Sequence, residues 1–107
     1  MNLLFICSRN QWRSRTAETI FKNKNGFQVK SAGTENSARI RVSNQLIKWA
    51  DLVFVMENKH KKRISEMFPE QIIDKKIIVL DIPDEFKYMD EELIDNLNDS
   101  VSFHLAL

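Results

Sequence analysis

Apolar residues along the chain fall into four short runs that are typical of buried β-strands. The run at residues 2–6 is continuous, residues 27–33 alternate apolar and polar side chains, and the runs at 51–56 and 75–83 are rich in Val, Ile and Leu. Continuous runs are characteristic of parallel strands covered on both faces. Alternation is characteristic of a strand at the margin of a sheet. The pattern therefore predicts four strands.

Between and after these runs, apolar residues recur at helical spacing. Four segments have this spacing: 14–23, 43–50, 58–68 and 89–105. Ser43, Asn58 and Asp90 are residue types that cap helix N-termini, and we expect them to cap the last three helices. The residues expected to face the core from the last two helices are Ile64, Met67, Phe68, Leu93, Ile94, Leu97 and Val101. His60 is expected to stay in solvent with the neighbouring basic side chains.

Strands that alternate with helices form right-handed crossovers and a parallel sheet. We therefore expect one α/β domain over residues 1–107, a three-layer open sandwich with a four-stranded parallel sheet. Ligands bind such sheets beyond the carboxyl ends of the strands. Cys7 stands at that edge, and the loops at residues 31–34, at Glu57 and at residues 81–86 leave the sheet there too. Four loops should converge near one thiol.

Composition narrows the function classes. The 107 residues carry a formal net charge of +1, which argues against a protein that binds nucleic acid through many phosphate contacts. The apolar start lacks a basic leader and is far shorter than the roughly 20 residues that span a bilayer, so we expect a cytoplasmic protein that does not bind membranes. A lone cysteine cannot form an internal disulfide, and with only two histidines a zinc site is not expected.

The loop that follows Cys7 has the composition of a phosphate-binding site. If residues 7–13 curve around a centre before the helix begins, their N–H groups and the helix N-terminus form a cradle for a tetrahedral dianion. Such a field stabilises a thiolate, which is the nucleophilic form of cysteine. Arg13 can present a planar fork to two phosphoryl oxygens, and Ser14 can donate its hydroxyl to the sulfur. Asn10 tolerates the left-handed conformation that a tight loop without glycine requires.

The segment CSRNQWRS at residues 7–14 resembles the active-site loop of the low-molecular-weight protein tyrosine phosphatases, in which a cysteine is followed by five residues, an arginine and a serine or threonine. Three further segments resemble this family in the same order: SAGT at residues 31–34, ADLVFVMENKH from Ala50 and DIPDEF from Asp81. The resemblance implies the phosphotyrosine phosphatase I-like form of the predicted sandwich.

The resemblance also implies a mechanism. Cys7 attacks the phosphorus, Arg13 and the loop amides hold the phosphoryl oxygens, and Asp84 protonates the leaving oxygen. Asp81, which directly follows the fourth apolar run, is the alternative acid. The residues expected to bind phosphate are Ser8, Arg9, Asn10, Gln11, Trp12 and Arg13. No metal or cofactor is implied, and the expected substrate is a phosphotyrosine protein or a small aryl phosphate.

The chain departs from the family pattern at several positions. Arg9 replaces a glycine, and Trp12 replaces a second cysteine that protects the nucleophile in many members, so peroxide should oxidise Cys7 without that safeguard. Trp12 is instead a candidate apolar wall for an aromatic substrate. Glu85 stands where proline is usual, with Phe86 next to it at the pocket entrance. The stretch between SAGT and ADLV is much shorter than usual.

Two other functions fit the same loop. A phosphocysteine carrier would use Cys7 as a relay, although such carriers lack the closing arginine. A phosphate-binding regulatory module with weak or no catalysis is compatible with the shortened region and with Glu85. Trp49 is expected in the core, whereas Phe86 and Tyr88 fit the core and the pocket rim equally. The pattern makes no prediction about oligomeric state.

Overall fold

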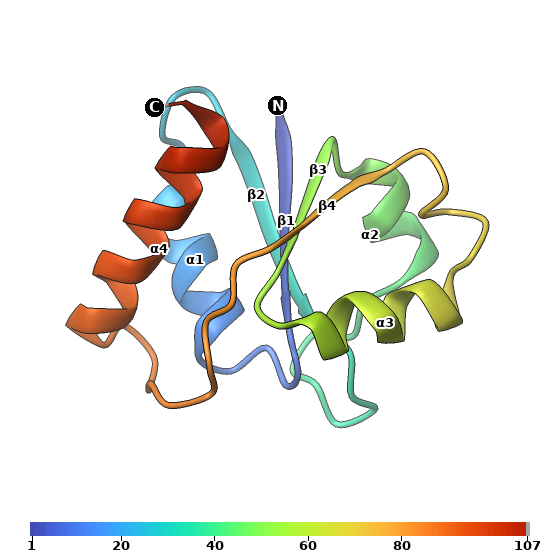
Figure 1. Cartoon of the computed structure of the whole chain (residues 1–107), viewed down its shortest axis with the longest axis horizontal. Helices are drawn as coiled ribbons and strands as arrows, with labels where there is room; N and C mark the ends of the chain where they lie inside the picture. Colours follow the sequence, from blue (N-terminus) through green and yellow to red (C-terminus); the bar gives the residue numbers. More distant parts are fainter. Residues whose placement is uncertain (107) are drawn as a thin grey trace.

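The computed structural model describes residues 1–106, in which four strands alternate with four helices (Figure 1). In chain order they are β1 (Asn2–Cys7), α1 (Arg13–Phe21), β2 (Gln28–Gly33), α2 (Asn44–Trp49), β3 (Leu52–Val55), α3 (Asn58–Met67), β4 (Lys76–Val79) and α4 (Glu91–Leu105). The expected α/β fold with a four-stranded parallel sheet is confirmed. The single domain over residues 1–107 stays a prediction, and Leu107 lies outside the described residues.

The sheet places the end of β1 at a ligand-binding position. The strand order is β2-β1-β3-β4, so β1 pairs with β2 on one side and with β3 on the other. Helices α1 and α4 cover one face of the sheet, and α2 and α3 cover the other (Figure 1). Because the chain first crosses to one side of β1 and later to the other, the topological switch point lies beside the carboxyl end of β1.

The core explains the apolar run at the start of the chain. Alternate residues of β1 enter two apolar clusters, one on each face of the sheet. In the cluster under α1 and α4, Phe5 stacks between Phe21 and Phe54, with ring centroids 5.6 and 5.0 Å apart. A strand buried on both faces needs apolar residues throughout, which is why this run does not alternate.

The fourth strand is shorter than its apolar run predicts. It ends at Val79 rather than at Pro83, because Asp81 has a left-handed φ of 55°, which a strand does not accommodate. The backbone N–H groups of Leu80 and Ile82 still donate to carbonyls at the end of β3 and just after it. The segment therefore stays beside β3 and delivers the next loop to the edge of the sheet.

The start of α3 also differs from the expectation. The N-cap is Glu57 rather than Asn58, and it forms a capping box in which the His60 ring takes the place usual for Glu or Gln. The expectation that His60 lies in solvent is wrong, because the side chain is only 1% exposed. Both ring nitrogens are hydrogen-bonded, and this compensates for burying a polar ring.

The N-caps of α2 and α4 and most of the predicted core-facing residues agree better with the sequence-based expectations. Ser43 caps α2 by accepting the N–H of Leu46, and Asp90 caps α4. The predicted core residues Ile64, Leu93, Leu97 and Val101 are buried, whereas Ile94, Met67, Phe68 and Trp49 are only half-buried. No helix within residues 1–106 combines the length and the apolar character needed to cross a bilayer.

Candidate active site

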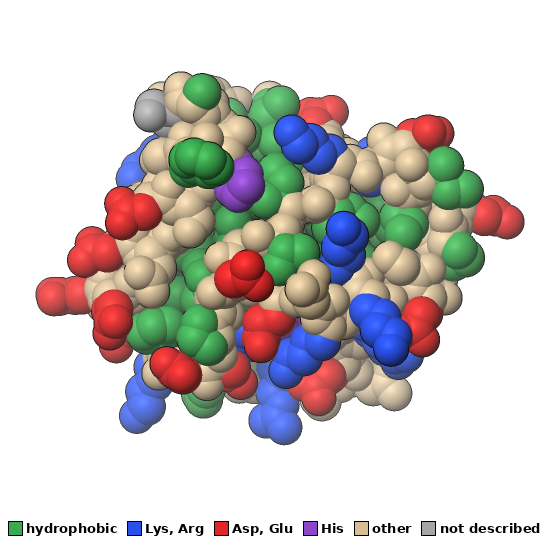
Figure 2. All heavy atoms as spheres, in the orientation of Figure 1, with side chains coloured by type: hydrophobic (Ala, Val, Ile, Leu, Met, Phe, Trp, Pro, Cys, Tyr) green, Lys and Arg blue, Asp and Glu red, His purple; other side chains and the backbone are tan. Residues whose placement is uncertain are grey.

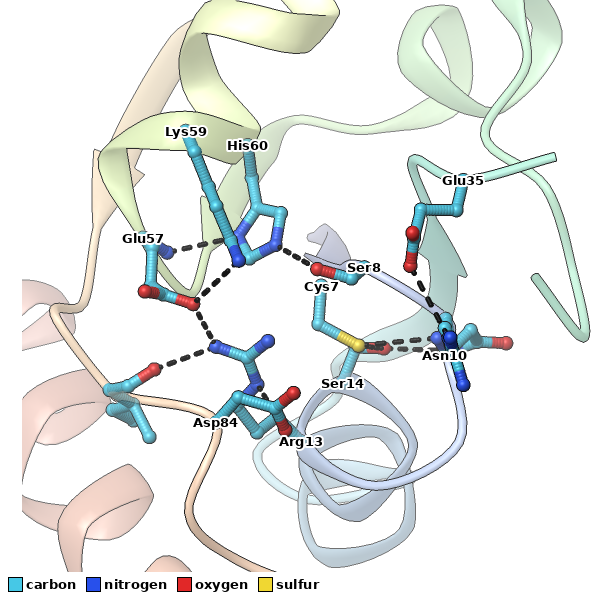
Figure 3. A network of polar contacts seen from close by, with 12 residues as sticks. Cys7, Ser8, Asn10, Arg13, Ser14, Glu35, Glu57, Lys59, His60 and Asp84 are labelled. Carbon is cyan, nitrogen blue, oxygen red and sulfur yellow. Dashed lines mark hydrogen bonds and ion pairs between the residues drawn. The ribbon is translucent and has the colours of Figure 1, made fainter. Parts of the chain in front are cut away.

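The loop after β1 curves around a cavity of about 390 Å³ at the carboxyl edge of the sheet (Figure 3). The lining residues are Cys7, Ser8, Arg9, Gln11, Trp12, Arg13, Glu35, Lys59 and Asp84. They come from the segments that follow the carboxyl ends of all four strands, as the parallel arrangement predicts. Glu35 and Lys59 are the two lining residues that were not expected from the sequence.

The backbone of this loop is oriented from outside by the loop after β2. Four consecutive carbonyls accept hydrogen bonds of 3.0 to 3.1 Å: Cys7 O from Thr34 N, Ser8 O from Glu35 N, Arg9 O from Arg39 N and Asn10 O from Arg39 Nε. In a trans peptide the carbonyl and the following N–H point in opposite directions. Outward carbonyls therefore turn the N–H groups of residues 8–11 away from the β2 loop and towards the inside of the curve.

Gly33 allows these two loops to approach each other. A Cβ atom at this position would lie 2.5 Å from the Ser8 carbonyl oxygen and 2.7 Å from Cβ of Ala38. Both distances are far below van der Waals contact, and the first neighbour is backbone that cannot swing away. The glycine of SAGT therefore serves the loop after β1, because it lets the end of β2 lie directly against that loop.

Cys7 lies at the base of the cavity, with 3% of its surface exposed. Its Sγ is 2.9 Å from Ser14 Oγ and 3.3 Å from the donating N–H of Asn10. Asn10 has the expected left-handed conformation, with a φ of 57°. Its side-chain amide donates to Ser14 Oγ and to Ser31 Oγ at 2.8 Å each. Because Ser14 accepts from Asn10, its own hydrogen is left for the sulfur or for the Ala32 carbonyl, which lies 3.3 Å from Ser14 Oγ. Asn10 itself offers the cavity only backbone.

Arg13 is the first residue of α1 and is 2% exposed. One terminal nitrogen, Nη1, donates to Glu57 Oε2 at 2.5 Å and to the Ile82 carbonyl at 2.9 Å, while Nε is 3.8 Å from Asp84 Oδ1. Burial alone would raise the pKa of Glu57. The hydrogen bond and charge of Arg13 outweigh burial and hold that pKa below its ordinary value. The guanidinium is thus fixed from behind by a carboxylate that stays ionised.

The start of α1 leaves its backbone donors available. Trp12 is the N-cap residue and makes no side-chain capping hydrogen bond. The first turn of a helix has N–H groups without intrahelical partners and a partial positive charge, and here both lie next to the cavity. An uncapped helix start beside a buried arginine and inward-facing amides is suited to bind an anion.

The structure separates the two candidate acids. Asp84 lines the cavity together with Cys7 and Arg13, whereas Asp81 lines a different hollow next to Pro83 and the start of α3. Of the aromatic candidates, Phe86 is buried in the core, and Tyr88 is exposed with its hydroxyl 2.8 Å from Thr19 Oγ1. Trp12 is 43% exposed at the wall of the cavity.

Glu57 and His60 contact the expected site residues but were not assigned to the site from the sequence. His60 Nε2 lies 2.9 Å from Ser8 Oγ, and its Nδ1 accepts the backbone N–H of Glu57 at 3.0 Å (Figure 3). The available signal was the position of Glu57 just after β3, at the same edge as Cys7. The three-residue spacing to His60 has meaning only once the helix start is known.

The surroundings of the cavity are basic on one side. Lys and Arg side chains gather around α3, whereas Asp and Glu side chains line α4 (Figure 2). A neighbouring hollow, which shares Ser8, Glu35 and Lys59 with the cavity, also has Arg63 in its wall. Anionic groups are therefore attracted to the site from the side of α3.

Comparison with known proteins finds similar sequences and structures. No protein-family model matches the chain. A protein-arginine-phosphatase from Geobacillus stearothermophilus is 35% identical over 92 residues, and the match covers 64% of this chain and 62% of that relative's length. The chain thus spans less than two thirds of the relative that it matches in sequence.

Solved structures match over nearly the full length. The YwlE arginine phosphatase from Geobacillus stearothermophilus superposes with a TM-score of 0.75 and 26% identity, covering 98% of this chain and 92% of that one. A low molecular weight protein tyrosine phosphatase from T. tengcongensis also gives a TM-score of 0.75, with 22% identity and 100% and 99% coverage. These likenesses show that the chain has the fold of the low-molecular-weight phosphatases and that it is similar to an arginine phosphatase in sequence and structure.

Proposed function

We propose that this protein is a cysteine-dependent phosphatase that works through a phosphocysteine intermediate. The observation that carries the proposal is that Cys7, Arg13 and Asp84 line one cavity, around which the loop amides are turned inward. A nucleophile, a fixed cation and a carboxyl group thus surround a space where a phosphoryl group fits. The similarity to arginine phosphatases in sequence and structure favours the same chemistry.

In the first step, the Cys7 thiolate attacks phosphorus, a sulfur–phosphorus bond forms and the bond to the leaving group breaks. Asp84 gives its proton to the leaving atom. Arg13 and the inward amides of residues 8–11 hold the equatorial oxygens, on which negative charge is concentrated. In the second step, water attacks the phosphocysteine, Asp84 takes a proton from that water, and the thiolate leaves with the Ser14 hydroxyl donating to it.

The proposal is tested by hydrolysis of para-nitrophenyl phosphate in the presence of a chelator. The protein should turn over without metal, vanadate should inhibit it, and Cys7→Ser should abolish turnover. Turnover that persists in Cys7→Ser would refute the proposal. A pH–rate profile of Asp84→Asn, with Asp81→Asn as matched control, identifies the acid: Asp84→Asn alone should lose the decline in rate at high pH.

Phosphotyrosine is the first proposed substrate. Trp12 presents an exposed indole at the cavity wall, where the ring of an aryl phosphate can pack. A phosphotyrosine peptide should therefore be hydrolysed faster than a phosphoserine peptide of the same sequence, and Trp12→Ala should reduce that preference. Equal rates on both peptides with the wild-type protein would contradict the assignment.

Phosphoarginine is the second candidate, and a specific observation favours it. The relative matched in sequence is named a protein-arginine-phosphatase. Two carboxylates, Glu35 and Asp84, line the cavity and suit a guanidinium leaving group. Values of kcat/KM for matched phosphoarginine and phosphotyrosine peptides separate the two candidates. A higher value for phosphoarginine would replace the first assignment by the second.

The remaining alternatives have distinct signatures. A phosphocysteine carrier would form a stable phosphoenzyme that water releases only very slowly. A regulatory module would bind inorganic phosphate and show no turnover. Arg13 in the cavity favours hydrolysis over the carrier. A cytoplasmic location and phosphoprotein partners belong to the same proposal.

A further inference from the structure

The protonation state of His60 can be assigned from its two contacts. Its Nδ1 accepts the backbone N–H of Glu57, so Nδ1 carries no hydrogen. A neutral imidazole has a single N–H group, which must then be on Nε2. Nε2 is 2.9 Å from Ser8 Oγ, and it therefore donates to the Ser8 hydroxyl. The capping box at the start of α3 fixes the tautomer.

The charges around the ring keep it neutral. Burial lowers the pKa of His60 to about 4, and the cations of Arg13 and Lys59 lower it as well. The carboxylates of Glu57 and Asp84 act in the opposite direction but do not outweigh these effects. These groups come from α1, from the start of α3 and from the loop after β4. At neutral pH His60 thus has one donor, and the donor points at Ser8.

A hydroxyl that accepts a hydrogen bond from histidine keeps its own hydrogen for another acceptor. Ser8 directly follows Cys7 and lines the cavity, and within residues 1–106 its Oγ has His60 as its only hydrogen-bonding partner (Figure 3). An oxygen of a bound phosphoryl group is an acceptor that the cavity provides. The hydroxyl would act there with the backbone amides of the same loop.

We propose that His60 is a positioning residue that turns the Ser8 hydroxyl into a hydrogen-bond donor to the phosphoryl group held above Cys7. The inference rests on the proposed function, since it concerns the same bound group. Glu57, which fixes the His60 tautomer, also holds Arg13. One helix start thus orients the side-chain donors on both sides of the cavity.

Two substitutions of similar size separate this role from simple packing. In His60→Gln the amide nitrogen can take the position of Nε2 and donate to Ser8. In His60→Asn the side-chain oxygen can still accept the Glu57 N–H, but no donor reaches Ser8. We expect His60→Gln to keep kcat/KM for para-nitrophenyl phosphate within about threefold of wild type. His60→Asn should lose roughly tenfold, the usual effect of one hydrogen bond.

A double-mutant cycle tests whether His60 acts through Ser8. Ser8→Ala should reduce kcat/KM about as much as His60→Asn, and adding His60→Asn to Ser8→Ala should change it little further. Losses that multiply, or equal losses in His60→Gln and His60→Asn at equal thermal stability, would overturn the proposal. They would show that His60 serves only the packing of the loop.

The inference is also measured without turnover. Nitrogen NMR of the wild-type protein at pH 7 should show a neutral His60 ring with its hydrogen on Nε2, and an Nδ1–H ring or a charged ring would overturn the proposal. The double-mutant cycle of Ser8→Ala and His60→Asn is also measured with vanadate affinity as the readout. If the wild-type protein binds vanadate but hydrolyses nothing, the proposed function fails while the cycle still tests His60. If vanadate does not bind, both fail.

Discussion

Arg13 is held in position before any ligand arrives, because Glu57 and the Ile82 carbonyl both engage Nη1 of its guanidinium. Its Nε lies 3.8 Å from Oδ1 of Asp84, which lines the cavity. A pre-positioned fork stabilises charge that develops on phosphoryl oxygens without reorganising during the reaction. Lysine cannot reproduce the planar fork of donors.

Arg13→Lys should therefore lower kcat/KM for para-nitrophenyl phosphate by roughly 100-fold or more, as loss of an oxyanion donor does elsewhere. Arg15→Lys is the matched control. Arg15 is exposed, lies 4.5 Å over the Tyr88 ring and does not line the cavity, so its replacement should change the rate little. Similar losses of kcat/KM in both variants would contradict a specific role of the Arg13 guanidinium in holding the phosphoryl group.

Gly33 provides a second test at the scale of one residue. The methyl group in Gly33→Ala would meet the Ser8 carbonyl at 2.5 Å, so the loop after β1 must shift. We expect a loss of roughly 1–3 kcal/mol in the free energy of unfolding, as in other overpacked sites, together with a lower kcat. Gly26→Ala, which meets nothing within 4 Å but has a φ of 74°, should cost only about 1 kcal/mol and spare kcat. Denaturant unfolding and steady-state kinetics measure both quantities.

For the secondary-structure elements, apolar periodicity in the sequence predicted which segments form strands and helices, but it did not predict where β4 ends or where α3 begins. Strand and helix identity followed from apolar periodicity, which depends only on which residues face the core. The end of β4 depended on the backbone of Asp81, and the start of α3 on a capping box whose histidine is buried by another loop. Such features arise from contacts between distant segments, which local sequence does not encode.

A helix cap remote from the cavity should affect stability alone. Ser43 accepts the N–H of Leu46 at the start of α2, and neither residue lines the cavity. Ser43→Ala should lower the free energy of unfolding by about 1 kcal/mol and leave kcat/KM unchanged. Ser43→Asn, which retains a capping side chain, is the control in denaturant unfolding. A large loss of activity in Ser43→Ala would mean that α2 is coupled to the site.

At the scale of the whole molecule, the site is the product of the topology. Cys7, Ser14 and Arg13 could be assigned from one contiguous segment because the chemistry of a phosphate loop is local. Glu57 and His60 could not, because their contacts exist only when β1 and β3 lie side by side with parallel ends. Local sequence thus suffices to propose the reacting groups, whereas the groups that contact and orient them are brought in by the fold.

The buried histidine makes the stability of the molecule depend on pH. The pKa of His60 is about 4 when folded and near 6.5 when unfolded, so between these values only the unfolded chain binds the proton. Stability should fall as the pH falls from about 6.5 to 4, by roughly 3 kcal/mol in total. Urea unfolding at a series of pH values measures this loss. The His60→Gln variant should lose much less stability over the same pH range. An equal dependence of the free energy of unfolding on pH in the two proteins would contradict a neutral, buried His60.

In the proposed function, inward amides and the Arg13 guanidinium hold a phosphoryl group above the Cys7 sulfur. A crystal structure of the protein grown with vanadate tests it most directly, because vanadate adopts the trigonal geometry of a transferring phosphoryl group. We predict vanadium bonded to Cys7 Sγ, with its oxygens contacted by Arg13 and by the amides of residues 8–11. Vanadate bound only in the neighbouring hollow beside Arg63, with the sulfur of Cys7 free, would refute this mode of phosphoryl binding.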